Sequence, residues 1–147
     1  MEPIKDSLVI GSLLPHSGDM CLLDSVVNWN ENSIECRASS HRNCANPLRH
    51  QEVLPIQAGI EYLAQAMAIH GTLCEQRAGR PRSGYLTVLT NVDWYCSRLD
   101  DLPRDLRALA RKLLSTEGGL NYSFSLYHEQ RLLLEGQAVV ALQDLAR

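Results

Sequence analysis

The carboxyl group best placed for chemistry in this sequence belongs to Glu61, the only acidic residue between Val53 and Cys74. Its neighbours are mostly apolar or small, and a carboxyl group removed from water there favours its protonated form. A protonated carboxyl group can act as a general acid. The alternative is a buried glutamate that a backbone or side-chain partner satisfies.

Histidines are the natural bases to accompany such an acid, because a neutral imidazole accepts a proton near its reference pKa. The five histidines are His16, His41, His50, His70 and His128. His50 lies eleven residues before Glu61 and is one candidate base. We expect His41 and His128 to be solvated, and His70, nine residues after Glu61, to be a satisfied group in the core.

The residues around Glu61 predict a helix that begins after Pro55 and ends near 79–81. Apolar or small residues recur at helical spacing, namely Ile56, Ile60, Leu63, Ala64, Met67, Ala68 and Leu73. The opposite side is also poor in charge, so the helix is expected to be buried against a sheet. Gln65, one turn after Glu61, can hydrogen-bond the carboxyl group and fix its orientation.

The start of this helix offers a second functional group. The expected N-cap, Leu54, has no side-chain oxygen, so the N–H groups of Gln57, Ala58 and Gly59 have no obvious local acceptor. With the positive end of the helix dipole, these donors can hold a substrate carbonyl oxygen. Solvation or a loop carbonyl is the alternative.

The rest of the chain reads mostly as strands. Segments 22–27, 33–38, 85–89, 122–127 and 132–142 are rich in strand-forming residues or bounded by turn residues. Segment 106–115 is ambiguous, because its leucines and alanines match helical spacing while alternation also fits parts of it. One buried helix among five to six strands predicts an α+β fold with the helix packed on an antiparallel sheet.

Composition indicates one domain covering residues 1–147, with 45% hydrophobic residues and a net charge of −3. Scattered Lys and Arg residues argue against nucleic-acid binding. The five cysteines include no C-x-x-C pair, which favours reduced thiols in the cytoplasm. We expect no membrane span, because no window holds 18 apolar residues. The sequence also has no metal-spaced cluster and no Gly-rich phosphate loop, so no metal or other cofactor is expected.

Two motifs resemble the hotdog-fold 3-hydroxyacyl-carrier-protein dehydratases. Residues 14–24, LPHSGDMCLLD, resemble the L-P-H-x-x-P-x-L-L-x-D opening of that superfamily. Pro55 followed by residues 59–66, GIEYLAQA, resembles its P-G-x-x-x-x-E-A-x-A-Q helix, and is most similar to the branch associated with aryl-polyene biosynthesis. The resemblance implies an antiparallel sheet wrapped around one long central helix, with segment 106–115 as a strand. It also implies that two protomers join their sheets and build two active sites at the interface.

The sequence departs from the family at the usual catalytic histidine. That position, fourteen residues before Glu61, holds Pro47; Asp19 and Ile56 also replace a proline and a glycine of the motifs. The resemblance implies that the Leu14-Pro15-His16 segment lines the tunnel for the acyl chain, beside the two catalytic residues. His16 is therefore our first candidate for the base, with a structural role as the alternative.

The resemblance implies a dehydratase that acts on 3-hydroxyacyl thioesters of acyl carrier protein or CoA in fatty-acid or polyene biosynthesis. The expected catalytic residues are His16 and Glu61; the expected substrate-binding residues are Leu14, Pro15, Gln57, Ala58, Gly59 and Gln65. A homodimer or higher homo-oligomer is expected. Two alternatives remain, an acyl thioesterase and a non-catalytic acyl-binding partner subunit. Three arginines lie near the end of the helix: Arg77, Arg80 and Arg82. We expect them to be solvated in a loop. The alternative is that they bind the phosphate of a phosphopantetheine arm or an acidic carrier protein.

Overall fold

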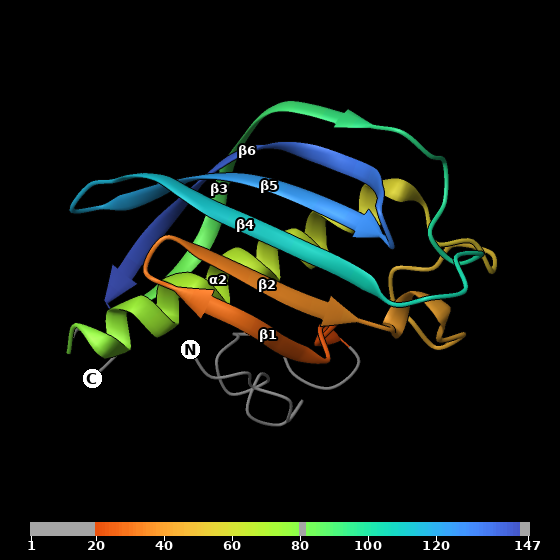
Figure 1. The fold of residues 1–147 in the computed structure, drawn as a ribbon, viewed down its shortest axis with the longest axis horizontal. Coiled ribbons are helices and arrows are strands. Elements are labelled where there is room, and N and C mark those ends of the chain that lie inside the picture. Colours follow the sequence, from red (N-terminus) through yellow and green to blue (C-terminus); the bar gives the residue numbers. More distant parts are fainter. Residues whose placement is uncertain (1–19, 80–81, 145–147) are drawn as a thin grey trace.

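One long helix, α2 (Gly59–Arg77), lies against a single six-stranded antiparallel sheet (Figure 1). The computed structural model describes residues 20–79 and 82–144. This is the α+β hotdog arrangement that the sequence and the resemblance predicted. No helix in the described part of the chain is long and apolar enough to cross a membrane.

The helix is buried nearly all round, as its lack of charge predicted. A 3-10 turn, η3 (Ile56–Ala58), precedes it, and a left-handed Gly79 with φ of 75° follows it. A Cβ atom at position 59 would lie 2.8 Å from Leu126 Cδ2 on the sheet, so a larger residue there would force this buried leucine to shift. The glycine therefore lets the start of α2 approach the strands closely.

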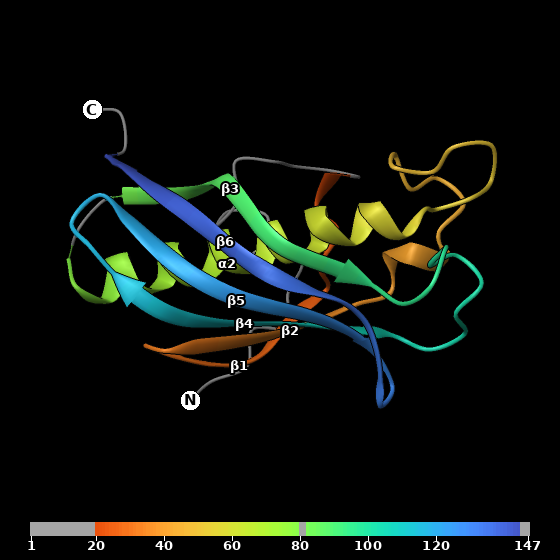
Figure 2. The ribbon, with the colours of Figure 1, turned by 90° about the horizontal axis from the view of Figure 1, so that it is seen from above.

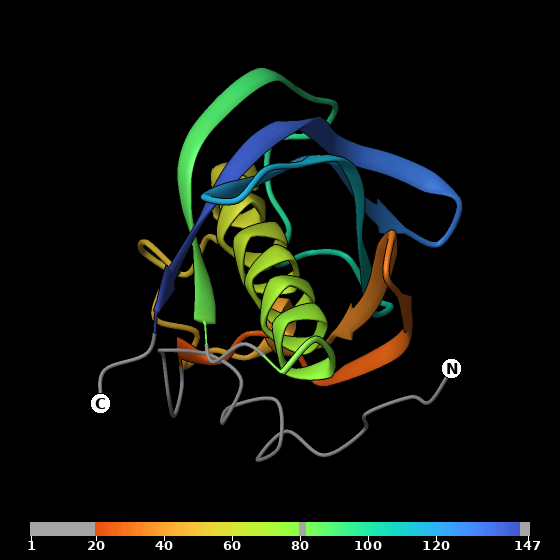
Figure 3. The same ribbon diagram turned by 90° about the vertical axis from the view of Figure 1, so that its left-hand side faces the viewer.

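The strands run in the order β1-β2-β4-β5-β6-β3, so β1 and β3 form the two edges of the sheet (Figure 2). Their bounds are β1 (Ser25–Asn30), β2 (Ser33–Ala38), β3 (Arg82–Trp94), β4 (Leu106–Ser115), β5 (Gly119–His128) and β6 (Arg131–Asp144). All five strand segments expected from the sequence are present. The curved sheet wraps around α2, as Figure 3 shows along the helix axis.

Segment 106–115 is the strand β4, as the resemblance implied and against its helical spacing. Leu106, Ala108 and Ala110 alternate inward and are buried, whereas Leu113 and Leu114 are more than half exposed. The helical spacing of this segment combines these exposed leucines with buried residues such as Leu106 and Ala110. Pairing with β2 and β5 on either side decides the conformation.

The start of α2 is fixed by the segment that follows β3. The Ile56 N–H donates to the Ser97 carbonyl at 3.1 Å, and the Leu99 N–H donates to the Leu54 carbonyl at 2.8 Å. The Leu54 N–H donates to Asp100 Oδ1 at 2.9 Å. These bonds hold the segment that leads into α2 against the loop that follows β3.

Candidate active site

Glu61 lies in the first turn of α2 and is half-buried. Its Oε1 atom is 3.4 Å from Gln65 Nε2, one helical turn further on. The predicted contact between these two residues is confirmed. The carboxyl group is less enclosed than its apolar sequence neighbours suggested, because Glu61 lies with the partly exposed Ile60 and Ala64 near the start of the helix.

Gln65 connects the helix to the segment before β1. The side chain is 1% exposed; its Oε1 accepts the Leu22 N–H at 2.9 Å, and its Nε2 donates to the Met20 carbonyl at 2.6 Å. An N–H can only donate and a carbonyl can only accept, so these two bonds fix the amide orientation. The NH₂ group consequently faces Glu61.

A second cluster of polar side chains binds the carbonyl group of Leu22, whose N–H group is bonded to Gln65. The Ser40 hydroxyl donates to the Leu22 carbonyl at 2.8 Å and lies 2.7 Å from the Tyr62 hydroxyl. Asn46 Nδ2 donates to the same tyrosine oxygen at 3.0 Å. Sequence reasoning missed Ser40, Asn46 and Tyr62, although Tyr62 adjoins Glu61 and Asn46 directly precedes Pro47.

The first-choice base, His16, lies outside the described residues together with Leu14 and Pro15. The rival base, His50, is exposed beside a tight turn in which Gln51 and Glu52 both have positive φ. The described residues therefore bring no imidazole into hydrogen-bond contact with Glu61.

The three remaining histidines all lie in contact with other parts of the protein, but only His70 was predicted to do so. His70 is a satisfied core group, as predicted: Nε2 donates to the Asn30 carbonyl at 2.7 Å, and Nδ1 lies 2.5 Å from the Tyr122 hydroxyl. The prediction that His41 is solvated is wrong. It is fully buried with Nε2 3.0 Å from the Leu102 carbonyl, and burial lowers its pKa. His128 is half-buried and accepts the Arg104 N–H at 3.1 Å.

The helix start differs from the expectation of free N–H donors. The Ala58 N–H donates to the Pro55 carbonyl at 2.9 Å, and the Gly59 N–H points at the carbonyls of Ile56 and Gln57. The 3-10 turn, with Pro55 rather than Leu54 as its N-cap, supplies these acceptors. A substrate-binding role of Gln57, Ala58 and Gly59 stays a prediction, and a substrate oxygen there would have to share the bonded N–H groups of Ala58 and Gly59.

The arginines at the far end of α2 are engaged with the protein itself. Arg77 stacks on Trp29, with 4.2 Å between its guanidinium carbon and the ring centroid. Arg82 makes a bidentate ion pair with Glu75 at 2.8 and 3.0 Å, and that pair is largely buried. Arg80 lies outside the described residues.

Other candidate groups are less suited to chemistry. Phe124 is a core residue, whereas Trp94 and Tyr95 are about half exposed. Burial raises the pKa of the thiols of Cys21, Cys36, Cys74 and Cys96. Within residues 20–79 and 82–144, no three His, Cys, Asp or Glu side chains gather in a group that could hold a metal ion.

Comparison with known proteins agrees with this geometry. Residues 8–146 match the sequence profile of the ApeP-like family, described as ApeP dehydratase. The dehydratase heterocomplex ApeI:P from Xenorhabdus doucetiae has a similar structure, with a TM-score of 0.81, 22% identity, and coverage of 92% of this chain and 91% of that chain.

Thioesterases share the fold at lower similarity. A thioesterase from Haemophilus influenzae has a TM-score of 0.63 at 11% identity, covering 83% of this chain and 79% of that one. A mutant thioesterase from Pseudomonas aeruginosa has a TM-score of 0.58 at 12% identity, covering 82% and 81%. No curated protein matches the sequence.

The sheet wrapped around one helix is a hotdog fold, which this chain shares with the dehydratase heterocomplex and the two thioesterases. Among hotdog proteins, the chain belongs to the ApeP-like dehydratase family.

Proposed function

We propose that the protein is a 3-hydroxyacyl-thioester dehydratase that converts carrier-bound or CoA-bound substrates into trans-2-enoyl thioesters in fatty-acid or polyene biosynthesis. The reaction removes a proton from C2 and the hydroxyl group from C3, and it releases water. It therefore needs a base for the C2 proton, an acid for the departing hydroxyl, and donors for the charge that develops on the thioester oxygen. Family membership and the arrangement around Glu61 support this assignment.

The observation that carries the proposal is the position of Gln65 between Glu61 and the Met20–Leu22 segment. A carboxyl group in the first turn of a buried helix, held by an amide that cannot rotate, is a preorganised acid. In the mechanism proposed here, Glu61 donates a proton to the leaving hydroxyl group.

His16 is proposed as the base on the grounds of chain connectivity. It precedes Met20 by four residues in the sequence. Met20 is itself hydrogen-bonded to the side chain that contacts Glu61. This short separation in sequence, together with the exposure of His50 on a separate turn, favours His16 over His50 as the base.

We extend the proposal to the setting in which the enzyme works. The five cysteines are free, which fits a reducing cytoplasm. The edge strand β3 carries exposed Tyr85, Val88 and Leu89, which suits pairing with a second protomer. A homodimer or a higher homo-oligomer is therefore proposed.

The test is product analysis with the purified protein and a 3-hydroxyacyl thioester. A new conjugated double bond, followed by absorbance and confirmed by mass spectrometry of the enoyl product, supports the proposal. A free acid with released thiol would instead identify a thioesterase, a second candidate favoured by the single helix-borne carboxylate and the thioesterase fold relatives.

Absence of turnover would favour a third role, that of a partner subunit for a competent homologue. Pro47 at the usual histidine position motivates this alternative, and one similar structure is itself a heterocomplex. Adding a homologous dehydratase and measuring a gain in turnover would establish it.

A further inference from the structure

A series of hydrogen bonds runs from the loop after β2 to the helix that carries Glu61. The donor in each bond can be assigned, beginning at the buried Asn46. Its Oδ1 atom accepts the Leu48 N–H at 2.9 Å, so its Nδ2 atom carries both amide protons. One of these protons is donated to the Ser40 carbonyl at 2.9 Å, and the other to the Tyr62 hydroxyl oxygen at 3.0 Å. Both amide protons are therefore bonded inside the protein.

The next two bonds have a single possible direction. The Ser40 hydroxyl has one proton and donates it to the Leu22 carbonyl at 2.8 Å, because a carbonyl can only accept. The Tyr62 hydroxyl, 2.7 Å away, must therefore donate its own proton to Ser40 Oγ. Burial raises the pKa of Tyr62, so its hydroxyl keeps the proton that this bond requires. The Leu22 carbonyl is thus held by a hydroxyl group that Tyr62 orients.

Leu22 continues the series to the candidate active site. Its carbonyl is bonded to Ser40, and its N–H donates to Gln65 Oε1 at 2.9 Å. The NH₂ group of Gln65 then faces Glu61 Oε1 at 3.4 Å. The hydrogen bonds consequently join six residues, which we name the Tyr62 network: Asn46, Tyr62, Ser40, Leu22, Gln65 and Glu61.

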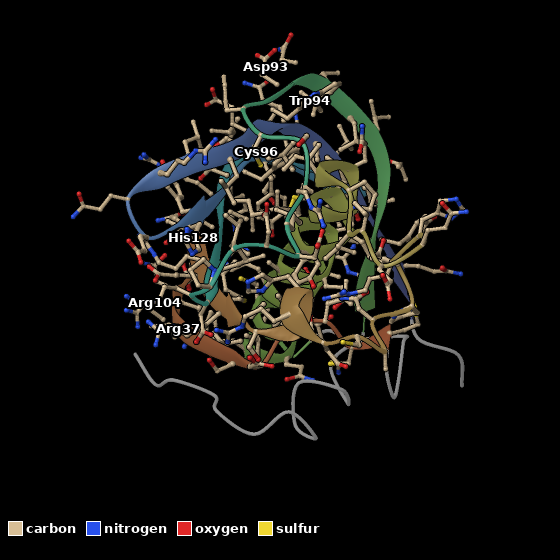
Figure 4. All side chains as sticks on the ribbon, turned by 90° about the vertical axis from the view of Figure 1, so that its right-hand side faces the viewer. Arg37, Asp93, Trp94, Cys96, Arg104 and His128 are labelled. Atoms are coloured by element: carbon tan, nitrogen blue, oxygen red, sulfur yellow. The ribbon has the colours of Figure 1, made fainter. Side chains whose placement is uncertain are left out.

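The Tyr62 network lies at the end of the fold where α2 begins, which Figure 4 faces. There, the loop between Cys96 and Arg104 passes beside the start of the helix and fixes its backbone. The network fixes the side chain that contacts Glu61. Tyr62 and Leu22 are fully buried, and hydrogen bonds in surroundings of low dielectric constant strengthen one another. We therefore expect the loss of one bond to loosen its neighbours in the network as well.

We infer that Tyr62 is a positioning residue that sets the orientation of the Glu61 carboxyl group through the Tyr62 network. This inference rests on the proposed function, in which Glu61 is the acid. Tyr62 adjoins Glu61 in the sequence, but the bonds that connect its hydroxyl group to the carboxyl group pass through Ser40, Leu22 and Gln65. A group that transfers a proton must be held within a narrow range of positions, so a small displacement lowers the rate strongly.

The test compares two tyrosines that are both fully buried. Tyr62→Phe removes the hydroxyl group from the network, whereas Tyr122→Phe removes a hydroxyl group that is bonded to His70 instead. At a temperature where each variant is folded, we expect Tyr62→Phe to lower kcat for enoyl-thioester formation roughly 10–100-fold with KM nearly unchanged. Tyr122→Phe should keep the wild-type kcat even where its melting temperature falls as far. A merely structural tyrosine would change the melting temperature and leave kcat unchanged.

A pair of serine variants tests the same network if Tyr62→Phe does not fold. Ser40→Ala removes the hydroxyl group that holds Leu22 and should lower kcat by a similar factor. Ser39→Ala is the matched control, because the Ser39 hydroxyl donates to Asp24 Oδ2 at 2.6 Å, outside the network, and it should keep kcat. When either Tyr62→Phe or Ser40→Ala is combined with Gln65→Met, the losses in kcat should not multiply, since both changes act on Glu61 through the same bonds.

The inference is overturned if Tyr62→Phe and Ser40→Ala keep the wild-type kcat, or if their losses multiply with that of Gln65→Met. A wild-type protein without turnover on any 3-hydroxyacyl thioester would contradict the proposed function alone. In that case, NMR measurement of the exchange of the Gln65 NH₂ protons with water still decides the inference. Faster exchange in Tyr62→Phe than in Tyr122→Phe supports it, and equal exchange in the two variants overturns it.

Discussion

The side-chain oxygen of Gln65 accepts a 2.9 Å hydrogen bond from the backbone N–H of Leu22, forty-three residues earlier in the chain. This bond ties the helix that carries Glu61 to the last part of the opening motif, residues 14–24. Because the same amide also bonds the Met20 carbonyl, its third contact, with Glu61, has a fixed direction. The first prediction tests this relationship.

Gln65→Met keeps the length of the side chain and removes all three hydrogen bonds. The buried Leu22 N–H would lose its acceptor, so we expect a loss of about 1–3 kcal/mol in the free energy of unfolding, measured with urea. Turnover under conditions where the variant is folded should also fall, because Glu61 loses its orientation. Gln137→Met, on an exposed position of β6, is the matched control and should change neither quantity. Full turnover in Gln65→Met would show that the amide does not position the carboxyl group.

Glu61→Gln keeps the shape and hydrogen bonding of the side chain but removes its acidity. If Glu61 donates the proton to the leaving hydroxyl, formation of the enoyl thioester should fall roughly 10²–10⁴-fold. Glu31→Gln, in the exposed turn between β1 and β2, should retain full activity. Retained turnover in Glu61→Gln would remove the dehydratase mechanism proposed above.

The base is tested by the pair His16→Asn and His50→Asn. We expect His16→Asn to lose turnover by a factor similar to that of Glu61→Gln, with the oligomer intact, and His50→Asn to retain it. Since the acid and base act as a unit, the losses should not multiply in the Glu61→Gln, His16→Asn double variant. Loss of activity only in His50→Asn would assign the role of the base to His50, in the turn before α2.

The fold was predictable from the sequence wherever the spacing of apolar residues in a segment matched the conformation of that segment. The helix around Glu61 is apolar on all sides, and β5 alternates Leu120, Tyr122, Phe124 and Leu126 toward the core, so both could be predicted from sequence alone. Segment 106–115 could not, because leucines that end up exposed near its hairpin imitate a helical stripe. Only the pairing with its neighbours in the sheet decides that conformation.

The candidate site was predictable only where its residues share one helix. Glu61 and Gln65 are one turn apart, so their contact follows from helical geometry. The contacts of Tyr62 with Ser40 and Asn46 join residues 22 and 16 positions apart through an irregular loop, and no periodic signal encodes them. The burial of His41 beneath the loop that contains Leu102 was missed for the same reason.

Oligomerisation is tested at the edge strand β3. Val88 and Leu89 are 48% and 39% exposed on a thirteen-residue edge, and such an edge is expected to pair with another chain. Light scattering at micromolar concentration should give at least twice the 16.4 kDa mass of one chain. Val88→Lys should shift the protein toward the monomer, whereas Leu113→Lys, at a position in β4 that is 54% exposed, should not. A wild-type mass of one chain would contradict the proposed dimer.

The last prediction concerns pH and the loop that fixes the helix start. Asp100 is 8% exposed, and its hydrogen bonds from Arg98 and from the Leu54 N–H lower its pKa to about 2. A carboxyl group whose pKa is lower in the folded state stabilises the fold above its unfolded pKa of about 4, and this contribution is lost as pH falls toward 2. Asp100→Asn should therefore reduce the free energy of unfolding by about 1–2 kcal/mol at pH 7, and its difference from the wild type should shrink between about pH 4 and pH 2.

The neighbouring control is Asp101→Asn. The Asp101 side chain is 58% exposed and lies 3.9 Å from Arg98, so this change should alter the free energy of unfolding by less than about 0.5 kcal/mol. A difference for Asp100→Asn that stays constant across this pH range would mean that the charge of Asp100 does not stabilise the helix start.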